Sequence, residues 1–193
     1  MIQLREKPTL IGNKIILRPF RKEDLSDIAD CLKDPEVHKF TGSDDSDFDA
    51  KEIREWYYTR NNQDDRIDLA IEDKVNQIVV GEAVVNLYDE EKNSMNYRIL
   101  IGSKGRDKGF GTEATKLLTD YMFQNTDLNQ LTLGVYAFNP RAKRVYEKIG
   151  FVLESIDMGD LEYEGEMIDA YNMVLTRERW KENSNYEKGA YID

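Results

Sequence analysis

Apolar and polar residues follow two different spacings along this chain, and the spacing predicts an order of strands and helices. Short apolar runs rich in Val, Ile and Leu predict strands at residues 15–20, 68–72, 78–88, 97–101, 131–138, 152–157 and 167–175. Apolar residues three and four positions apart predict amphipathic helices at residues 24–32, 50–61, 114–122 and 141–148. These elements predict an α+β fold (an α/β sandwich), in which a mixed, mostly antiparallel central sheet of about seven strands carries helices on both faces.

The length of the chain and its polar stretches indicate how it is divided. A chain of 193 residues is expected to form one domain. Its core is expected over residues 14–176, with a polar lead-in at 1–12 and a polar, frayed tail at 181–193. Residues 41–49 are acidic and rich in turn formers, which predicts a solvated loop. A second acidic stretch, residues 160–166, is expected to connect the last two strands.

The junction between the strand at 97–101 and the helix at 114–122 is the first candidate site. It contains two glycines and two cations in Arg106-Asp107-Lys108-Gly109-Phe110-Gly111-Thr112. A helix N-terminus presents unpaired amide N–H groups and the positive end of the helix dipole, and glycine lets backbone approach a phosphate closely. The junction therefore indicates an anion site, although a Gly-x-Gly before a helix also occurs as a plain turn.

A second motif follows the strand at 131–138. Asn139-Pro140 predicts a helix N-cap followed by proline at the first helical position, and Gly150 predicts the end of that helix. The two blocks, Arg-x-x-Gly-x-Gly and then Asn-Pro-Arg-Ala-x-x-x-Tyr-x-Lys-x-Gly-Phe, resemble the GNAT superfamily of acetyl-CoA-dependent N-acetyltransferases. The match is to the branch of ribosomal-protein N-terminal and spermidine acetyltransferases. It covers residues 95–151 closely and residues 14–176 more loosely.

The resemblance implies that acetyl-CoA is the acetyl donor and that its pyrophosphate lies on the loop before the helix. The residues that it implies for cofactor binding are Leu100, Ile101, Arg106, Asp107, Lys108, Gly109, Phe110, Gly111, Thr112, Asn139, Ala142 and Tyr146. Leu100 and Ile101 would offer main-chain groups to the pantetheine arm as to an added strand. That arrangement requires two neighbouring parallel strands to separate.

The same resemblance implies an acid and leaves the base open. Tyr146 matches the family tyrosine whose hydroxyl protonates the departing CoA thiolate, so it is the expected general acid. The apolar helix face on which it lies would, by periodicity alone, indicate a core aromatic. This branch often carries a glutamate early in the strand before the loop, where this chain has Asn96. Glu82 or Asp89 is therefore a candidate base, with a water relay as the alternative.

Composition narrows the partners and the compartment. A net charge of −11 argues against nucleic acid and suits a cationic amine, although many cytosolic proteins are acidic for solubility. A single cysteine, Cys31, excludes an internal disulfide, and with a single histidine, His38, no metal site or Ser-His-Asp relay is expected. No apolar run approaches the length of about 20 residues that a helix needs to span a bilayer. The chain is expected in the cytoplasm, without a membrane partner.

The sequence leaves the acceptor and two other functions open. The acceptor is a polyamine, a protein N-terminus or another small amine such as an aminoglycoside, and the strand edges leave a homodimer open. An acyl-CoA-binding sensor on the same fold would follow from the missing base, because a fold does not guarantee activity. A dinucleotide-dependent oxidoreductase would use residues 109–114 as Gly-x-Gly-x-x-Ala. However, residues 102–108 separate the strand from the first glycine, where that fingerprint needs a tight turn.

Overall fold

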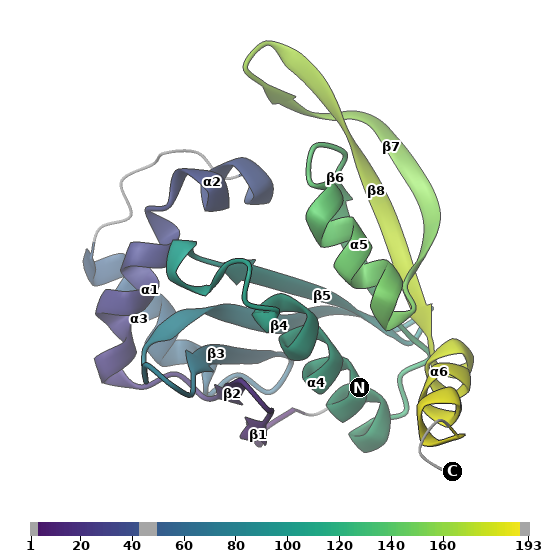
Figure 1. Cartoon of the computed structure of the whole chain (residues 1–193), viewed down its shortest axis with the longest axis horizontal. Helices are drawn as coiled ribbons and strands as arrows, with labels where there is room; N and C mark the ends of the chain where they lie inside the picture. The colour runs from purple at the N-terminus through teal and green to yellow at the C-terminus, as the bar shows by residue number, and fades with distance from the viewer. Residues whose placement is uncertain (1–3, 43–49, 190–193) are drawn as a thin grey trace. The chain divides into compact units, whose positions relative to one another are not determined.

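The computed structural model describes residues 4–42 and 50–189. Its strands are β1 (Leu10–Ile11), β2 (Ile15–Arg18), β3 (Ile67–Asp73), β4 (Val79–Asp89), β5 (Ser94–Ile101), β6 (Gln130–Tyr136), β7 (Val152–Tyr163) and β8 (Glu166–Thr176). Its α-helices are α1 (Leu25–Leu32), α2 (Pro35–Thr41), α3 (Ala50–Arg60), α4 (Phe110–Asn125), α5 (Pro140–Ile149) and α6 (Arg177–Gly189). Two 3₁₀ turns, η1 (Lys22–Asp24) and η2 (Ser103–Gly105), precede α1 and follow β5. Figure 1 shows these elements along the chain.

The strands of the described residues form one eight-stranded sheet in the order β1-β2-β3-β4-β5-β6-β8-β7. β5 and β6 run parallel, whereas β1–β2, β2–β3, β3–β4, β6–β8 and β7–β8 are antiparallel pairs. The predicted mixed, mostly antiparallel sheet is therefore confirmed. Its additional strand, β1, lies in the stretch predicted as a polar lead-in. Two apolar residues at a sheet edge are too few to show an alternating pattern.

The chain forms two compact units, and β4, β5 and α4 contribute residues to both of them. Unit 1 contains residues 1–87 and 97–118, and unit 2 contains residues 88–96 and 119–193. The expectation that the whole chain is a single domain stays a prediction.

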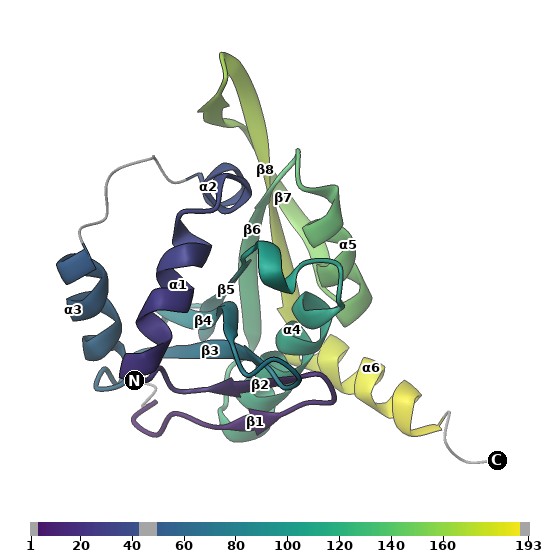
Figure 2. The same ribbon diagram turned by 60° about the vertical axis from the view of Figure 1, so that its left-hand side comes forward.

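Helices cover both faces of the sheet in unit 1 (Figure 2). On one face, α1, α2 and α3 pack on β3 and β5 through an apolar cluster of Phe20, Ile28, Cys31, Val37, Tyr57, Ala70, Val79 and Leu100. On the other face, the first turns of α4 contact β5, where the Tyr97 hydroxyl donates to Thr115 Oγ1 (2.9 Å). Helices on both faces were predicted from the alternation of strands and helices, and this is confirmed.

A buried cluster of charged residues lies at the end of β2 in unit 1. Arg18 is 5% exposed and donates to both carboxylate oxygens of Asp24, each at 2.8 Å. Its Nε donates to Glu72 of β3 at 2.5 Å. Hydrogen bonding to Asp24 raises the pKa of Arg18 even though burial opposes it. The cluster thereby attaches η1 to the sheet.

A β-bulge interrupts the pairing of β3 with β4. The register shifts between Ile71, which pairs with Gly81, and Glu72, which pairs with Val79, so Val80 is the additional residue. The amide of Gly102, just after β5, donates to the Val80 carbonyl (2.8 Å). The bulge therefore lies next to Gly81, and it supplies a carbonyl that holds the chain after β5.

Gly81 is required by a close approach of β5. A Cβ built on Gly81 would lie 2.1 Å from the Leu100 carbonyl oxygen and 3.0 Å from the Ile101 Cα. Both atoms belong to backbone, which cannot rotate away as a side chain can. Gly81 thus fixes the backbone position of the two residues predicted to contact the pantetheine arm.

In unit 2, α5 packs on the sheet formed by β6, β8 and β7, with Lys143 Nζ 5.7 Å from the centroid of the Tyr171 ring (Figure 1). α6 continues from β8 and is attached at two points. Arg177 donates to the carbonyls of residues 123, 126 and 128 at 2.6–2.7 Å. Trp180 donates to Asp120 (2.7 Å) and stacks on Phe123. These contacts attach the first turn of α6, which continues to Gly189, and the fraying expected from residue 181 stays a prediction.

The long hairpin of β7 and β8 corrects a second prediction. Residues 160–166 were expected to form an acidic loop, but only Glu164 and Gly165 form the turn, with φ of 52° and 82°. Two successive positive φ values are typical of a two-residue type I′ hairpin turn. Most of β7 is exposed, so its residues show no alternation of apolar and polar types. Of the predicted acidic loop at 41–49, Thr41 ends α2, and residues 43–49 lie outside the described residues.

Candidate functional site

The loop between β5 and α4 is held in unit 1 by two carboxylates at the start of α2, those of its N-cap Asp34 and of Glu36. Arg106 Nη2 lies 2.5 Å from Asp34, and Arg106 Nη1 lies 2.5 Å from Glu36. Asp34 also accepts the amides of Glu36 and Ser103 (2.9 Å each). Burial by itself would raise the pKa of Asp34, but the Arg106 and amide hydrogen bonds lower it overall. Arg106, predicted as a cation for the cofactor, is therefore engaged with two acids that the sequence analysis did not connect to it.

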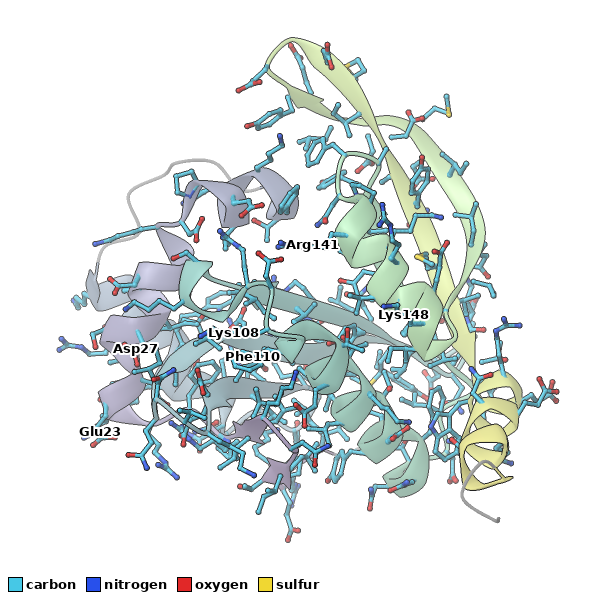
Figure 3. The ribbon with its side chains drawn as sticks, viewed as in Figure 1. Glu23, Asp27, Lys108, Phe110, Arg141 and Lys148 are labelled. Carbon is cyan, nitrogen blue, oxygen red and sulfur yellow. The ribbon has the colours of Figure 1, made fainter. Side chains whose placement is uncertain are left out.

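The second cation of the loop also has protein partners. Lys108 Nζ lies 3.5 Å from the Asp73 carboxylate and 5.5 Å from the centroid of the Phe110 ring. The Lys108 carbonyl accepts Lys14 Nζ (2.9 Å). Figure 3 shows Lys108 and Phe110 at the start of α4. Because Arg106 and Lys108 are both paired with acidic side chains, the backbone N–H groups are the main source of positive potential in this loop.

The backbone of the loop is arranged as an anion site requires. Asp107 (φ 60°) and Gly109 (φ 80°) both adopt left-handed conformations, which turn the chain sharply into α4. The first helical hydrogen bond runs from the Glu113 amide to the Gly109 carbonyl (3.2 Å). The amides of Phe110, Gly111 and Thr112 precede it, so they belong to the group that has no intrahelical acceptor. The positive end of the α4 dipole lies at the same place.

The first turn of α4 is fixed to β5 and to the β1–β2 turn. Thr115 donates to the Gly111 carbonyl (2.7 Å) and accepts from Tyr97 of β5. The Glu113 carboxylate accepts the amides of Asn13 and Lys14. These bonds hold the helix N-terminus in one position relative to the strand before it.

The pairing of β5 with β6 ends early. Their parallel ladder joins Ser94 to Gln130, Met95 to Leu131 and Asn96 to Thr132, although β5 continues to Ile101 and β6 to Tyr136. No further β5–β6 pair occurs among the residues that the structure describes. The ladder between the two strands therefore ends at Asn96, before the end of β5 at Ile101.

In unit 2, α5 carries the remaining predicted cofactor residues. Asn139 is the N-cap of α5, as predicted, and its Oδ1 accepts the Ala142 amide (3.1 Å). Gly150 ends the helix with φ 114°, also as predicted. Figure 3 shows Arg141 and Lys148 toward opposite ends of α5.

Tyr146 is 7% exposed, and its ring lies edge-on to Phe151 with centroids 6.0 Å apart. Burial raises the pKa of its hydroxyl. A phenol in this setting stays protonated throughout the neutral range, so it has a proton to donate.

The two candidate bases differ in their surroundings. Asp89, in unit 2, accepts the Lys92 amide (3.1 Å) and so stabilises the turn that follows β4. Glu82, in unit 1, is 3% exposed and pairs with Arg98 of β5 at 3.2 Å. Tyr57 of α3 donates a hydrogen bond to the same carboxylate. Burial raises the pKa of Glu82, while Arg98 and Tyr57 oppose the rise.

Arg98 and Tyr57 were not singled out by sequence. Arg98 lies on β5 two residues before Leu100, at the spacing that puts two strand residues on one face, so alternation could have placed it beside this site. Its pairing with Glu82, and the hydrogen bond from Tyr57, join segments distant in sequence and have no local signal.

Two features are absent from the residues that the structure describes. No group of three or more His, Cys, Asp and Glu side chains is placed to hold a metal ion. Within the same residues, no helix is both long enough and apolar enough to cross a membrane.

Comparisons with known proteins give consistent results. Residues 14–152 match the family model of the acetyltransferase (GNAT) domain. The uncharacterised N-acetyltransferase p20 of Bacillus licheniformis is 24% identical over 181 residues, which cover 89% of this chain and 98% of that protein. Spermidine N(1)-acetyltransferase of Escherichia coli (strain K12) is 31% identical over 84 residues, 44% of this chain and 45% of that protein. The structure of spermidine N-acetyltransferase from Vibrio cholerae, in complex with CoA and spermine, has a TM-score of 0.79 at 20% identity, covering 88% of this chain and 99% of that one.

Proposed function

Since residues 14–152 match its model, the chain belongs to the GNAT acetyltransferase family, and we propose that it transfers the acetyl group of acetyl-CoA to a primary amine of a polyamine. The observation that carries the proposal is the junction of β5 and α4. There, a loop with two left-handed residues leads into a helix N-terminus, directly after a strand whose ladder to β6 ends at Asn96.

The residues present fit acetyl-CoA. The amides of Phe110, Gly111 and Thr112 would bind the pyrophosphate at the N-terminus of α4, where the helix dipole favours an anion. Leu100 and Ile101 would offer main-chain groups to the amides of the pantetheine arm. Arg106 and Lys108 act indirectly in this proposal, because their contacts with acidic residues hold the loop in shape. When bound, acetyl-CoA supplies the acetyl group already activated as a thioester.

Tyr146 and Glu82 would move the two protons of the reaction. The amine nitrogen attacks the thioester carbonyl carbon, a C–N bond forms and the C–S bond breaks. Tyr146 donates its hydroxyl proton to the departing sulfur. Glu82 first accepts a proton from the ammonium, which frees the lone pair that attacks, and the second proton that the nitrogen loses on forming the amide replaces the one given by Tyr146. The burial of Glu82 favours its role because a raised pKa makes a carboxylate a better base. The products are an acetamide and CoA in the thiol form.

A polyamine acceptor is supported by two observations. Two relatives, one from E. coli and one from V. cholerae, are named spermidine acetyltransferases, and a third, also from V. cholerae, is named a putative ribosomal-protein-serine acetyltransferase. The net charge of −11 attracts cations over long range, which favours their encounter with the protein at low salt.

The test is CoA-thiol release from acetyl-CoA with a panel of spermidine, an aminoglycoside and short peptides with Ala or Ser N-termini. We expect turnover with spermidine. Tyr146→Phe should lower kcat by about 100-fold or more, since a positioned general acid contributes roughly that factor, with the Kd of acetyl-CoA unchanged. Tyr163→Phe, which removes a tyrosine hydroxyl from β7 of the same unit, is the matched control and should keep wild-type kcat.

Each other outcome contradicts a defined part of the proposal. Turnover with peptides alone would leave acetyl transfer intact and refute the polyamine acceptor. Binding of acetyl-CoA without turnover of any amine would favour the acyl-CoA sensor. Failure to bind acetyl-CoA would refute the proposal as a whole.

A further inference from the structure

The Glu82 carboxylate is buried, whereas its cationic partner is not. The Glu82 side chain is 4% exposed and that of Arg98 is 49% exposed, with 3.2 Å between Oε1 and Nη2. Tyr57 donates to the same carboxylate from the opposite element, α3, and is itself buried. Arg98 therefore reaches from the surface of unit 1 to cover a charge that the protein interior holds in place.

The other cationic side chains near Glu82, those of Arg66 and Arg60, interact with other residues. Arg66 donates to both oxygens of Asp68 (2.6 and 2.7 Å). The Arg60 guanidinium carbon lies 3.4 Å from the centroid of the Trp56 ring, and its Nη1 donates to Gln63 (3.2 Å). The recorded ion pair of Glu82, within the described residues, is thus the one with Arg98.

The free energy that each partner gains from the ion pair depends on how exposed it is to water. A half-exposed cation gains only about 0–1 kcal/mol from an ion pair, because water solvates it almost as well when it swings out. A buried carboxylate, in contrast, needs a counter-ion, since leaving it unpaired costs several kcal/mol. Glu82 is consequently a fixed cation receptor, and Arg98 is an exchangeable occupant of it.

The receptor lies on the part of β5 where the proposed reaction takes place. Asn96, Arg98 and Leu100 alternate along β5 and so share one face. In the proposed function the pantetheine arm extends along β5 from Ile101 toward Asn96, where the ladder to β6 occupies the strand edge. Arg98 lies between these limits, about 7 Å along the strand from Leu100 at roughly 3.3 Å per residue.

We propose that Arg98 holds the place of the acceptor: the primary ammonium of the substrate displaces the Arg98 guanidinium from Glu82 and binds there. Arg98 is then a specificity-determining residue, because it makes every acceptor compete with an internal cation. Neutral nucleophiles, which cannot replace a charge on Glu82, are rejected. This inference rests on the proposed function, since it names the group that receives the ammonium in that reaction.

The experiment compares Arg98→Met with Arg98→Lys, using spermidine as the acceptor. Arg98→Met removes the competing cation, so the spermidine KM should fall by up to about five-fold, the equivalent of about 1 kcal/mol for a partly exposed pair, with kcat within two-fold. Arg98→Lys keeps a cation and should retain the wild-type KM. Binding of spermidine, measured by calorimetry without acetyl-CoA, should tighten by the same factor in Arg98→Met.

The matched control is Lys104→Met. Lys104 is also about half exposed and pairs at 3.2 Å, but its partner, Asp30, is 65% exposed. This variant changes the net charge by the same amount and should leave the spermidine KM unchanged. An equal fall of KM in Lys104→Met would show a general charge effect and overturn the inference.

Two further outcomes separate this inference from the proposed function. A higher KM or a lower kcat in Arg98→Met, restored in Arg98→Lys, would mean that Arg98 contacts the acceptor or orients Glu82, and the inference fails while acetyl transfer stands. Suppose that neither the wild-type protein nor any variant acetylates an amine, but spermidine binds more tightly to Arg98→Met than to the wild type. The inference then stands and the proposed function fails. Circular dichroism confirms that each variant is folded.

Discussion

Replacement of Gly81 by alanine tests whether the bulge of β4 positions the cofactor strand. The new Cβ would lie 2.1 Å from the Leu100 carbonyl oxygen and 3.0 Å from the Ile101 Cα. Real Cβ atoms do not approach backbone this closely, so β5 must move away from β4. Inserting one carbon into a well-packed interior costs about 1–3 kcal/mol, and the backbone obstacle places Gly81→Ala toward the upper end, about 2–3 kcal/mol.

Urea unfolding measures that loss. With a slope of about 2 kcal/mol per molar urea, a loss of 2–3 kcal/mol lowers the unfolding midpoint by about 1–1.5 M. Because Leu100 and Ile101 move with β5, we also expect the Kd of acetyl-CoA to rise at least about ten-fold, the equivalent of about 1.4 kcal/mol.

Gly134→Ala is the matched control, since Gly134 is also a strand glycine, in β6. A Cβ built there meets nothing nearer than an Asn172 side-chain oxygen at 3.9 Å, which is ordinary contact. Alanine is favoured over glycine in a strand interior by roughly 0.5–1 kcal/mol, so this variant should unfold at an equal or higher urea concentration. If Gly81→Ala unfolds at the same urea concentration as Gly134→Ala, the close approach of β5 to β4 is not rigid and the reasoning is refuted.

Three further changes test other parts of the structure. Arg18→Met leaves Asp24 buried without its cation and should lower the free energy of unfolding by about 3–5 kcal/mol; a loss under about 1 kcal/mol in urea would contradict this. Asn139→Ala removes the cap of α5 and should cost about 1 kcal/mol by thermal unfolding, whereas Asn139→Asp, which keeps the acceptor, should cost little. Burial raises the pKa of the Cys31 thiol to about 11, so at pH 8 a thiol reagent should react at least about 100-fold more slowly than in urea, where the pKa is about 8.5. As the pH rises from about 8.5 to 11, the thiol of the unfolded chain loses its proton before that of the folded protein, so Cys31 should lower the free energy of unfolding over that window. Equal labelling rates in the folded protein and in urea would contradict the burial of Cys31.

Residue types predicted those features that depend only on neighbouring residues, such as the ends of a helix. Asn139 and Gly150 were identified as the two ends of α5 from residue type alone, because a cap and a left-handed residue act within one helical turn. Gly81 of β4, in contrast, is required by the carbonyl of Leu100, which belongs to another strand. Residue types thus marked positions without revealing what packs against them.

Long-range contacts account for what the sequence did not show. Arg106 was expected to serve the cofactor, yet it pairs with Asp34 and Glu36, which are about 70 residues earlier in the chain. Glu82 was one of two equal candidates until its burial distinguished it from Asp89. The role of each predicted site residue, the homodimer and the cytoplasmic location stay predictions.

The exposed strand β7 has a consequence for how copies of this protein behave in solution. It is an edge strand of twelve residues, with one row of backbone donors and acceptors turned away from β8 and with Met158 78% exposed. Such an edge is a template for aggregation unless charge prevents another strand from pairing with it. Glu154, Asp157, Asp160 and Glu162 supply that charge, and no lysine or arginine of β7 offsets it. Replacing the four acids by their amides, Glu by Gln and Asp by Asn, removes this charge, and light scattering should then detect self-association of a folded protein through this edge.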